Sequence, residues 1–455
     1  MKNILIIGAG KSSSYVIKYL LEKSNEEKLH LTIGDVSIEN ATKLINNHKN
    51  AKAIIFDVFD KNQRENAIKN ATIVVSMLPA RFHIEVAKDC LKYGKNLVTA
   101  SYVSPAMKAL DKQVKAKELV FMNEIGVDPG LDHMSAMQVI DKIRNKGGKM
   151  LLFESFTGGL VAPESDTNLW NYKFTWNPRN VVLAGQGGAA MFIQEGTYKY
   201  IPYHKLFRRT EFLKINNQKF EAYANRDSLK YRETYGLKNI PTMYRGTIRR
   251  VGFSRAWNIF VQLGMTDDSY SIENSENMSY RDFVNLFLAY SPSDSVELKL
   301  RSYLKIDQDD VMWEKLLELD LFNPNKKIGI KNATPAKILQ KILEDSWTLQ
   351  ENDKDMIVMQ HLFGYEKEGK KEQIESSLIV FGENQNYTAM SKTVGLPLAI
   401  ATLKILNGEI TKPGVQIPIA KEVYQPILKE LKNHGIEFIE KKVPYLGYNP
   451  NHVIG

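Results

Sequence analysis

Cysteine is almost absent from this sequence, which contains only Cys90 in 455 residues. A chain with one cysteine cannot form an internal disulfide, and such usage is typical of a reducing compartment. We therefore expect a cytoplasmic protein in which Cys90 packs and does not react. The eight histidines show no metal-ligand spacing with carboxylates, so no metal site is expected.

Long apolar runs are also missing. No stretch approaches the roughly 20 apolar residues that cross a membrane, and the N-terminus resembles a strand and not a charged, cleavable signal. Lysine and arginine together exceed aspartate and glutamate, which gives a formal net charge of +9. These cations are scattered without interleaved aromatic residues, so neither nucleic acid nor a membrane is an expected partner. The excess positive charge would attract small anionic ligands.

The start of the sequence contains an informative short pattern. An apolar segment runs into Gly8-Ala9-Gly10-Lys11-Ser12-Ser13, and an amphipathic segment follows. Gly8 allows a tight turn, and Gly10 leaves the backbone open to a pyrophosphate at a helix N-terminus. Ser13 stands where the last glycine of the motif is usual, and it is small enough for close packing. Alone, the pattern could also be an ordinary strand-to-helix turn.

Asp35 strengthens the dinucleotide interpretation and bears on the choice of cofactor. It ends a second apolar segment about 20 residues after the glycines, where a carboxylate accepts hydrogen bonds from an adenosine ribose. A carboxylate there repels a 2′-phosphate, and the next residues, Val36-Ser37-Ile38, include no arginine. We therefore predict NAD in preference to NADP. The alternative is an aspartate that caps the next helix.

Residues 1 to about 125 alternate between strand and helix patterns, which indicates a doubly wound parallel sheet. Strands are expected at 3–8, 29–34, 52–56, 72–78, 96–99 and 119–123, and helices at 13–24, 38–48, 61–70, 82–93 and 105–117. Ligands of such folds bind at the carboxyl ends of the strands. The residues at those ends are therefore candidates for one binding crevice: Asp57, Val58, Leu78, Thr99, Ala100, Ser101 and Tyr102.

The pattern changes after residue 127. We expect a helix at 132–144, a strand at 150–156, and a Gly- and Asn-rich stretch without regular structure at 158–168. A helical lobe is expected at 265–350, a hairpin at 355–363 and 373–381, and helices at 391–406 and 421–434.

Seven segments run in a familiar order along the chain, at 99–105, 122–133, 158–160, 172–179, 225–228, 245–247 and 393–397. Together they resemble glutamate-forming saccharopine dehydrogenase, the saccharopine reductase family. The resemblance implies a Rossmann-type NAD(P)-binding domain at 1–126 that is completed by 386–455. It also implies a mixed α/β domain for saccharopine binding and dimerisation at 127–264 and 351–385, with the small helical lobe at 265–350. A homodimer is expected.

The implied activity is oxidation of saccharopine with NAD(P) and water to L-glutamate and 2-aminoadipate 6-semialdehyde, or the reverse. A preference for NAD fits oxidation during lysine breakdown. Leu169-Trp170-Asn171 departs from the family pattern, which leaves open a carboxynorspermidine-type reductase. A non-catalytic NAD-binding regulatory protein on the same fold also stays open.

The resemblance also assigns site residues. Arg226 and Arg245 would hold carboxylates, because guanidinium groups bind them in a bidentate manner. The other implied substrate contacts are Gly246, Thr247, Ser101 and Tyr102. Asp128 would act as an acid or base with Tyr102, although an aspartate before Pro129 and Gly130 could also simply organise a turn. The implied cofactor contacts are Gly8, Gly10, Lys11, Ser12, Ser13, Asp35, Asp57, Val58, Leu78, Thr99, Ala100, Val127, Asp128 and Pro129.

Four other polar residues receive weaker assignments. Arg179 and Lys173 are secondary candidates for binding carboxylates, and each could instead only brace its segment. His83 and His133 are interpreted as ordinary polar or partly buried residues.

Overall fold

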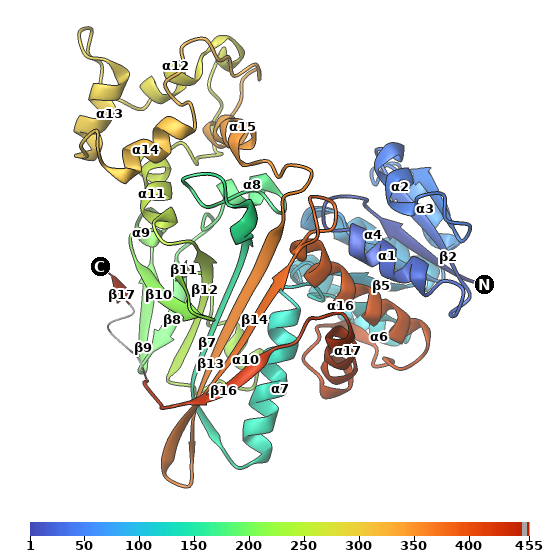
Figure 1. Ribbon diagram of the computed structural model, residues 1–455. Helices are drawn as coiled ribbons and strands as arrows, with labels where there is room; N and C mark the ends of the chain where they lie inside the picture. The colour runs from blue at the N-terminus through green and yellow to red at the C-terminus, as the bar shows by residue number, and fades with distance from the viewer. Residues whose placement is uncertain (448–452, 455) are drawn as a thin grey trace. The chain divides into compact units, whose positions relative to one another are not determined.

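The computed structural model describes residues 1–447 and the backbone of 453–454. The chain forms two compact units, each of which is described by itself (Figure 1). Unit 1 comprises Met1–Met150, Tyr365–Lys370 and Ser376–Lys441. Unit 2 comprises Leu151–Gly364, Lys371–Glu375 and the described residues from Lys442 onwards.

Unit 1 contains a seven-stranded parallel sheet in the order β15-β6-β5-β4-β1-β2-β3. Strands such as β1 and β4 are short apolar runs that are almost wholly buried, as expected where helices cover both faces. The strands are β1 (Lys2–Ile7), β2 (Leu29–Asp35), β3 (Ala51–Ile55), β4 (Ile73–Ser76), β5 (Asn96–Thr99), β6 (Val120–Met122) and β15 (Gly414–Gln416).

Helices cover this sheet. One face packs against apolar residues of α3, α4, α5 and α6, and α16 packs against α1 elsewhere in the unit. Gly395 of α16 allows α16 and α1 to pack closely, because a Cβ at this position would lie 2.7 Å from the backbone nitrogen of Val16. The helices are α1 (Ser14–Glu22), α2 (Ile38–Ile45), α3 (Lys61–Lys69), α4 (His83–Tyr93), α5 (Pro105–Ala109), α6 (Asp111–Ala116), α7 (Leu131–Asn145), α16 (Ala389–Leu406) and α17 (Lys421–Asn433).

The six strands predicted for the first part of the chain are confirmed, and the seventh, β15, was not predicted. The helix predicted at 105–117 is two helices, α5 and α6, that meet at Leu110. The compact unit also extends beyond the predicted boundary at 126, because it includes α7. Of the predicted C-terminal part at 386–455, the residues from Lys442 onwards are grouped with unit 2, and 448–452 and 455 lie outside the described residues.

Unit 2 contains most of a ten-stranded mixed sheet with the path β16-β14-β13-β7-β12-β11-β10-β17, while β8 pairs with β12 and β9. Its centre is the parallel pair of β7 and β12, and β11 and β10 continue antiparallel. The strands are β7 (Lys149–Val161), β8 (Ala190–Gln194), β9 (Thr197–Ile201), β10 (Thr210–Ile215), β11 (Gln218–Ala224), β12 (Thr242–Arg249), β13 (Asp355–Lys367), β14 (Lys370–Phe381), β16 (Ile439–Val443) and β17 (Val453–Ile454).

Strand β7 corrects one expectation. It was predicted to end at 156, but it continues to Val161 and includes Gly158, which we had assigned to an irregular stretch. A Cβ on Gly158 would lie 2.6 Å from the carbonyl oxygen of Ile248, so glycine permits the two strands to approach closely. Gly158, which we had predicted to lie in a loop, therefore allows close packing within a strand.

The predicted hairpin and helical lobe are both present; the lobe belongs to unit 2, whereas the hairpin turn belongs to unit 1. Strands β13 and β14 are joined through Glu368 and Gly369, which both have positive φ, as a type I′ turn requires. The lobe helices begin at Ser or Asp or Thr caps that accept a backbone N–H, such as Ser279 and Thr334. The helices of unit 2 are α8 (Pro178–Val182), α9 (Tyr203–Leu206), α10 (Tyr231–Thr234), α11 (Phe253–Leu263), α12 (Tyr280–Asn285), α13 (Val296–Leu304), α14 (Val311–Glu318) and α15 (Pro335–Trp347).

One helix contradicts the expectation that no apolar run approaches the length of a membrane span. Within the described residues, α16 has the length and apolar composition to cross a bilayer. Most of α16 is buried in the fold, as in a core helix of a globular protein.

Candidate functional site

The glycine turn between β1 and α1 has the geometry of a phosphate-binding corner. Gly8 has a φ of 105°, and a Cβ there would lie 3.0 Å from the carbonyl oxygen of Met77. A Cβ on Gly10 would meet no atom within 4 Å, so the space above this residue is open. Ser13 is buried and its hydroxyl donates to the carbonyl oxygen of Gly8 at 2.9 Å, which ties the helix start to the turn.

Asp35 lies against this turn. One of its carboxylate oxygens accepts from the backbone N–H of Ala9 at 2.6 Å, and the other accepts from the N–H of Ser37 at 2.9 Å. The carboxylate is therefore held at the carboxyl end of β2, directly beside the glycine turn. The following helix is capped by Ser37, whose hydroxyl accepts from the N–H of Asn40. The alternative reading of Asp35 as the cap of that helix is thus wrong.

The other predicted cofactor contacts also lie after the carboxyl ends of the strands of unit 1. Asp57 is exposed after β3, and its carboxylate accepts from the N–H of Phe59 at 2.9 Å. Val58 is buried, and its carbonyl oxygen accepts from Arg64. The remaining members of the predicted set are exposed Lys11, partly buried Ser12, Leu78, Ala100 and Asp128, and buried Thr99, Val127 and Pro129.

Tyr102 and Asp128 are brought together, as their predicted roles require. The Tyr102 hydroxyl donates to a carboxylate oxygen of Asp128 at 3.1 Å. The peptide bond between Asp128 and Pro129 is cis, and Gly130 follows with a φ of 143°. A Cβ on Gly130 would lie 2.3 Å from the backbone nitrogen of Gly126, so only glycine fits at this position.

The loop after β5 is braced by a buried hydrogen-bonded pair, Glu124 and His133. His133 Nε2 lies 2.8 Å from a carboxylate oxygen of Glu124, and the other oxygen accepts from the N–H of Val103 at 2.9 Å. The N–H of Glu124 donates to the carbonyl oxygen of Ser101 at 3.1 Å. The backbone on both sides of Tyr102 is therefore fixed by Glu124. No local sequence signal marks this pair, because it joins two segments through a tertiary contact.

His83 is also buried among hydrogen-bonding groups. Its ring is buried, with Nδ1 2.8 Å from the Ser76 hydroxyl and Nε2 2.8 Å from the Ser101 hydroxyl. The hydroxyl of Thr99 lies 3.1 Å from the same Nε2. Burial lowers the pKa of His83 to about 4, so the imidazole is neutral near pH 7.

Unit 2 holds the predicted carboxylate-binding arginines. Arg245 of β12 is buried, and its guanidinium lies 4.4 Å from the centre of the Tyr231 ring. Thr247 lies two residues further along β12 and faces the same side of the sheet. Gly246 faces the opposite side, where a Cβ would lie 2.7 Å from the Phe156 ring, so only its backbone is available to a ligand.

Arg226 follows strand β11, beside the first half of β12. The N–H of Asn225 donates to the carbonyl oxygen of Arg245 at 2.7 Å, which brings the two predicted arginines into adjacent positions. Arg226 is exposed and has a φ of 47°. Within the part of the chain that the structure describes, no carboxylate forms an ion pair with its guanidinium, so the group carries a charge that an anionic ligand could neutralise.

The two weaker candidates are engaged in structural ion pairs. The Lys173 ammonium group lies 2.7 Å from the carboxylate of Asp353, and both are largely buried. Arg179 pairs with Asp268. These contacts favour the bracing role for both residues.

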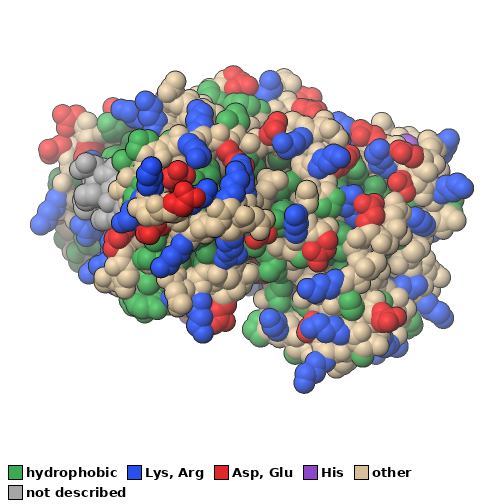
Figure 2. Space-filling model, turned by 90° about the horizontal axis from the view of Figure 1, so that it is seen from below, with side chains coloured by type: hydrophobic (Ala, Val, Ile, Leu, Met, Phe, Trp, Pro, Cys, Tyr) green, Lys and Arg blue, Asp and Glu red, His purple; other side chains and the backbone are tan. Residues whose placement is uncertain are grey.

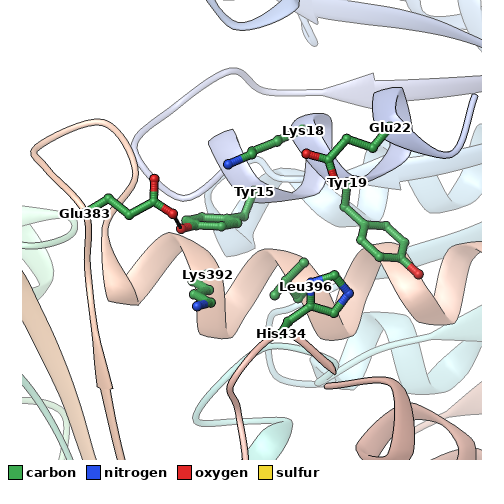
Figure 3. A pocket seen from close by; sticks show the side chains of 8 residues that line it. All are labelled: Tyr15, Lys18, Tyr19, Glu22, Glu383, Lys392, Leu396 and His434. Atoms are coloured by element: carbon green, nitrogen blue, oxygen red, sulfur yellow. Dashed lines mark hydrogen bonds between the residues drawn. The ribbon is translucent and has the colours of Figure 1, made fainter. Parts of the chain in front are cut away.

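Two cavities lie outside the predicted residues. The first, of about 180 Å³ in unit 1, is shown in Figure 3, where the Tyr15 ring lies between Lys18 and Lys392. Its two lysines are balanced by Glu22 and by Glu383, which accepts from the Tyr15 hydroxyl at 2.5 Å. The second, of about 520 Å³ in unit 2, is lined by residues of α11, β10 and the lobe. Neither holds a predicted site residue.

Metal chemistry has no visible support in the described part of the chain, where no group of three His, Cys, Asp or Glu side chains is placed to hold an ion. Cys90 is buried, and burial raises the pKa of its thiol, so the reactive thiolate is disfavoured.

These features define a class of protein. A doubly wound parallel sheet, an open glycine turn and a carboxylate after the second strand are the parts of a dinucleotide-binding α/β protein. The second unit supplies buried and exposed guanidinium groups suited to carboxylates.

Comparison with known proteins then gives the family. Residues 4–122 match the domain described as saccharopine dehydrogenase NADP binding domain, and residues 126–436 match the saccharopine dehydrogenase C-terminal domain. The chain belongs to the saccharopine dehydrogenase family. The fold and the family inferred from the sequence are thereby confirmed.

Relatives match over nearly the full chain. The chain is 32% identical over 450 residues to saccharopine dehydrogenase (NADP(+), L-glutamate-forming) of Saccharomyces cerevisiae, which covers 97% of this chain and 99% of the relative. It is 33% identical over 448 residues to the mitochondrial alpha-aminoadipic semialdehyde synthase of Rattus norvegicus, 96% of this chain and 47% of that protein. The solved structure of apo saccharopine dehydrogenase (L-Glu forming) from Saccharomyces cerevisiae has a TM-score of 0.87 at 32% identity, covering 97% of this chain and 100% of that one.

Proposed function

We propose that this protein oxidises saccharopine with NAD and water to L-glutamate and 2-aminoadipate 6-semialdehyde. The observation that carries the proposal is the hydrogen bond of 3.1 Å between the Tyr102 hydroxyl and the Asp128 carboxylate. The pair stands at the strand-end edge of a dinucleotide-binding sheet, in a chain of the saccharopine dehydrogenase family. A proton donor and a proton acceptor in contact at this edge suit the oxidation and hydrolysis of a secondary amine.

The residues present fit a nicotinamide dinucleotide. The open space at Gly10 would admit the diphosphate, and the first N–H groups of α1 would face it. Val36 and Phe59 are apolar yet 75% and 71% exposed on either side of this edge, which suits a flat adenine ring. When bound, the nicotinamide supplies the chemistry of hydride acceptance.

Asp128 and Tyr102 would handle the protons of the reaction. The substrate amine must lose a proton before its neighbouring carbon is oxidised, and the Asp128 carboxylate is the acceptor. Water then adds to the resulting imine, and the carbinolamine collapses when a proton reaches the departing amine nitrogen. The Tyr102 hydroxyl, in contact with Asp128, would deliver or relay that proton.

Arg226, Arg245 and Thr247 would bind the carboxylates of the substrate. Saccharopine carries three carboxylates, and planar guanidinium groups hold such groups with defined orientation. Arg245 is fixed against the Tyr231 ring, so it would bind one carboxylate in a set position. Exposed Arg226 would take a second.

We propose NAD as the preferred cofactor, in contrast to the relatives whose names carry NADP(+). The support is Asp35, whose carboxylate is held beside the glycine turn by the N–H groups of Ala9 and Ser37. A ribose 2′-hydroxyl can donate to this carboxylate, whereas a 2′-phosphate would be repelled by it. The use of NAD would also favour the oxidative, degradative direction.

Reaction rates measured with the purified protein test both the proposed activity and the proposed cofactor. Appearance of reduced nicotinamide on mixing with saccharopine is expected with NAD, at a kcat/KM at least tenfold above that with NADP. Asp35→Ser should narrow or reverse this ratio, while Glu39→Gln, an exposed carboxylate in the next helix, should leave it unchanged. Absence of turnover with either cofactor would reject the activity, and an NADP preference in the unchanged protein would reject the cofactor assignment.

The remaining expectations are part of the proposal. We infer a homodimer that works in the cytoplasm on a small-molecule substrate, without nucleic acid or membrane partners. On the face that Figure 2 displays, Lys and Arg side chains are interspersed with Asp and Glu. Light scattering coupled to gel filtration would give the molar mass, and a monomer at micromolar concentration would contradict the dimer.

A further inference from the structure

One buried imidazole joins two strand ends of unit 1. His83 is the first residue of α4 and is 4% exposed. Its Nδ1 lies 2.8 Å from Oγ of Ser76, the last residue of β4, and its Nε2 lies 2.8 Å from Oγ of Ser101, just after β5. Ser76, His83 and Ser101 therefore form a continuous hydrogen-bonded chain.

The neutral His83 ring allows two directions for these hydrogen bonds, one for each tautomer. Burial holds the pKa of His83 far below neutrality, so the ring carries one N–H and one lone pair. If Nδ1–H donates to Ser76, Nε2 accepts from Ser101, and the Ser101 oxygen can accept from a ligand. If Nε2 carries the proton, Ser101 accepts from His83 and its own proton can be donated to a ligand. In the first tautomer the ring orients the Ser101 hydroxyl proton, and in the second it fixes only the Ser101 oxygen, as an acceptor. The Thr99 hydroxyl lies 3.1 Å from the same Nε2 and shares it with Ser101.

The backbone of the same loop is held by other groups. Glu124 accepts from the N–H of Val103 and donates its own N–H to the carbonyl oxygen of Ser101. His133 holds the Glu124 carboxylate. Because the loop conformation is already fixed in this way, the contact from His83 acts on the Ser101 side chain and not on the course of the chain.

We propose that His83 is a positioning residue, which acts through the Ser76–His83–Ser101 chain to orient the Ser101 hydroxyl toward the substrate. The inference rests on the proposed function and on the expectation from the family resemblance that Ser101 contacts saccharopine. It adds a residue to which the family resemblance had given no role. A buried histidine that merely satisfies neighbouring hydroxyls would affect stability, but its effect on turnover would not depend on Ser101.

A double-mutant cycle between His83 and Ser101 separates these two roles. Asparagine at 83 can place a polar atom near the position of Nδ1, and glutamine can place one near Nε2. His83→Asn should keep the contact to Ser76 and lose the contact to Ser101, whereas His83→Gln should retain the latter. We expect about a tenfold loss of kcat/KM for saccharopine in His83→Asn, in Ser101→Ala and in the double variant alike. His83→Gln should stay within about threefold of the unchanged protein, and the KM for the dinucleotide should not move in any of them.

Several results would overturn the proposal. The first is a loss of kcat/KM in the double variant that equals the product of the two single losses. The second is a loss of kcat/KM in His83→Gln as large as that in His83→Asn. The third is an unchanged kcat/KM in Ser101→Ala. If His83→Asn does not fold, Ser76→Ala takes its place in the cycle, because Ser76→Ala removes the hydrogen bond at the other end of the His83 ring. The loss of kcat/KM caused by Ser76→Ala must then also vanish when Ser101→Ala is already present. Failure of the unchanged protein to turn over saccharopine would reject the proposed function, and this result is distinct from all of the others.

Discussion

Arg245 is the residue on which substrate binding most depends in the proposed function. It is buried on β12, and its guanidinium stacks on the Tyr231 ring. This cation–π contact stabilises the positive charge where water is excluded. Arginine suits this position better than lysine, because its planar group both stacks and binds a carboxylate in a bidentate manner. The residue contributes to the identity of the ligand more than to the reaction itself.

Replacement of this side chain should separate the two ligands. Arg245→Ala is expected to raise the KM for saccharopine by about 10- to 100-fold, the loss of a charge-assisted hydrogen bond of about 1.5–3 kcal/mol. The affinity for the dinucleotide should change less than twofold, since its proposed contacts lie in unit 1. Steady-state kinetics and calorimetry with each ligand provide the measurement.

The matched control is Arg255→Ala, which removes a 70% exposed guanidinium of α11 that pairs with Asp310. This change should leave both constants unaffected. Equal losses for saccharopine and dinucleotide in Arg245→Ala would show that the residue supports the fold and not the ligand.

The turn between β1 and α1 contains two glycines that are required for different reasons. Gly8 needs glycine for the fold, because its φ is positive and a side chain would press on Met77. Gly10 needs glycine only for a ligand, because its side-chain position is open. The two positions should therefore respond differently to the same substitution.

Gly10→Ala should leave the melting temperature nearly unchanged and weaken dinucleotide binding at least tenfold, or about 1.4 kcal/mol. Gly8→Ala should lower stability by roughly 1–3 kcal/mol, because alanine is strained at this φ. Thermal unfolding and calorimetric titration with NAD measure the two effects. Tight NAD binding by Gly10→Ala would place the diphosphate elsewhere.

At the scale of the whole molecule, the pH dependence of stability is set in part by two buried carboxyl groups of unit 2. Burial raises the pKa of Glu211 to about 7. Burial, together with the charge of Glu211, raises the pKa of Glu154 well above its ordinary value. Both groups are therefore protonated in the folded state at a pH where the unfolded chain has already released the protons.

This difference destabilises the fold as the pH rises. The contribution of Glu211 is fully present below its ordinary pKa of 4.5 and is lost as the pH rises through about 7. Glu211→Gln, which resembles the protonated form, should match the unchanged protein below pH 4.5, for example at pH 4. It should be more stable at pH 8 by roughly 3 kcal/mol, following about 1.4 kcal/mol per pKa unit.

Scanning calorimetry at the two pH values measures this effect. Glu314→Gln, which alters an exposed carboxylate in the same unit, should follow the unchanged protein at both values. If Glu211→Gln also has the stability of the unchanged protein at both pH values, the Glu211 carboxyl ionises normally in the folded state.

The sequence by itself determined six strands of unit 1 and the corner on which a dinucleotide is proposed to bind. Strand and helix periodicity is a local property, so six strands could be placed from residues 1–125, while their order came from the structure. Asp35 and the glycines were found because their spacing along the chain carries the chemistry. Resemblance supplied Asp128, Tyr102 and the two arginines.

Only the tertiary structure decided how these residues are held and which polar residues are already engaged. Ser76, His83 and Ser101 meet because β4, β5 and α4 are adjacent in space, and no periodicity marks that contact. Gly158 belongs to a strand because a neighbouring backbone approaches it, although its composition indicates a loop. Arg179 is engaged because Asp268, far along the chain, lies beside it. Such contacts join distant segments, and their energies depend on distance and burial that a linear pattern does not contain.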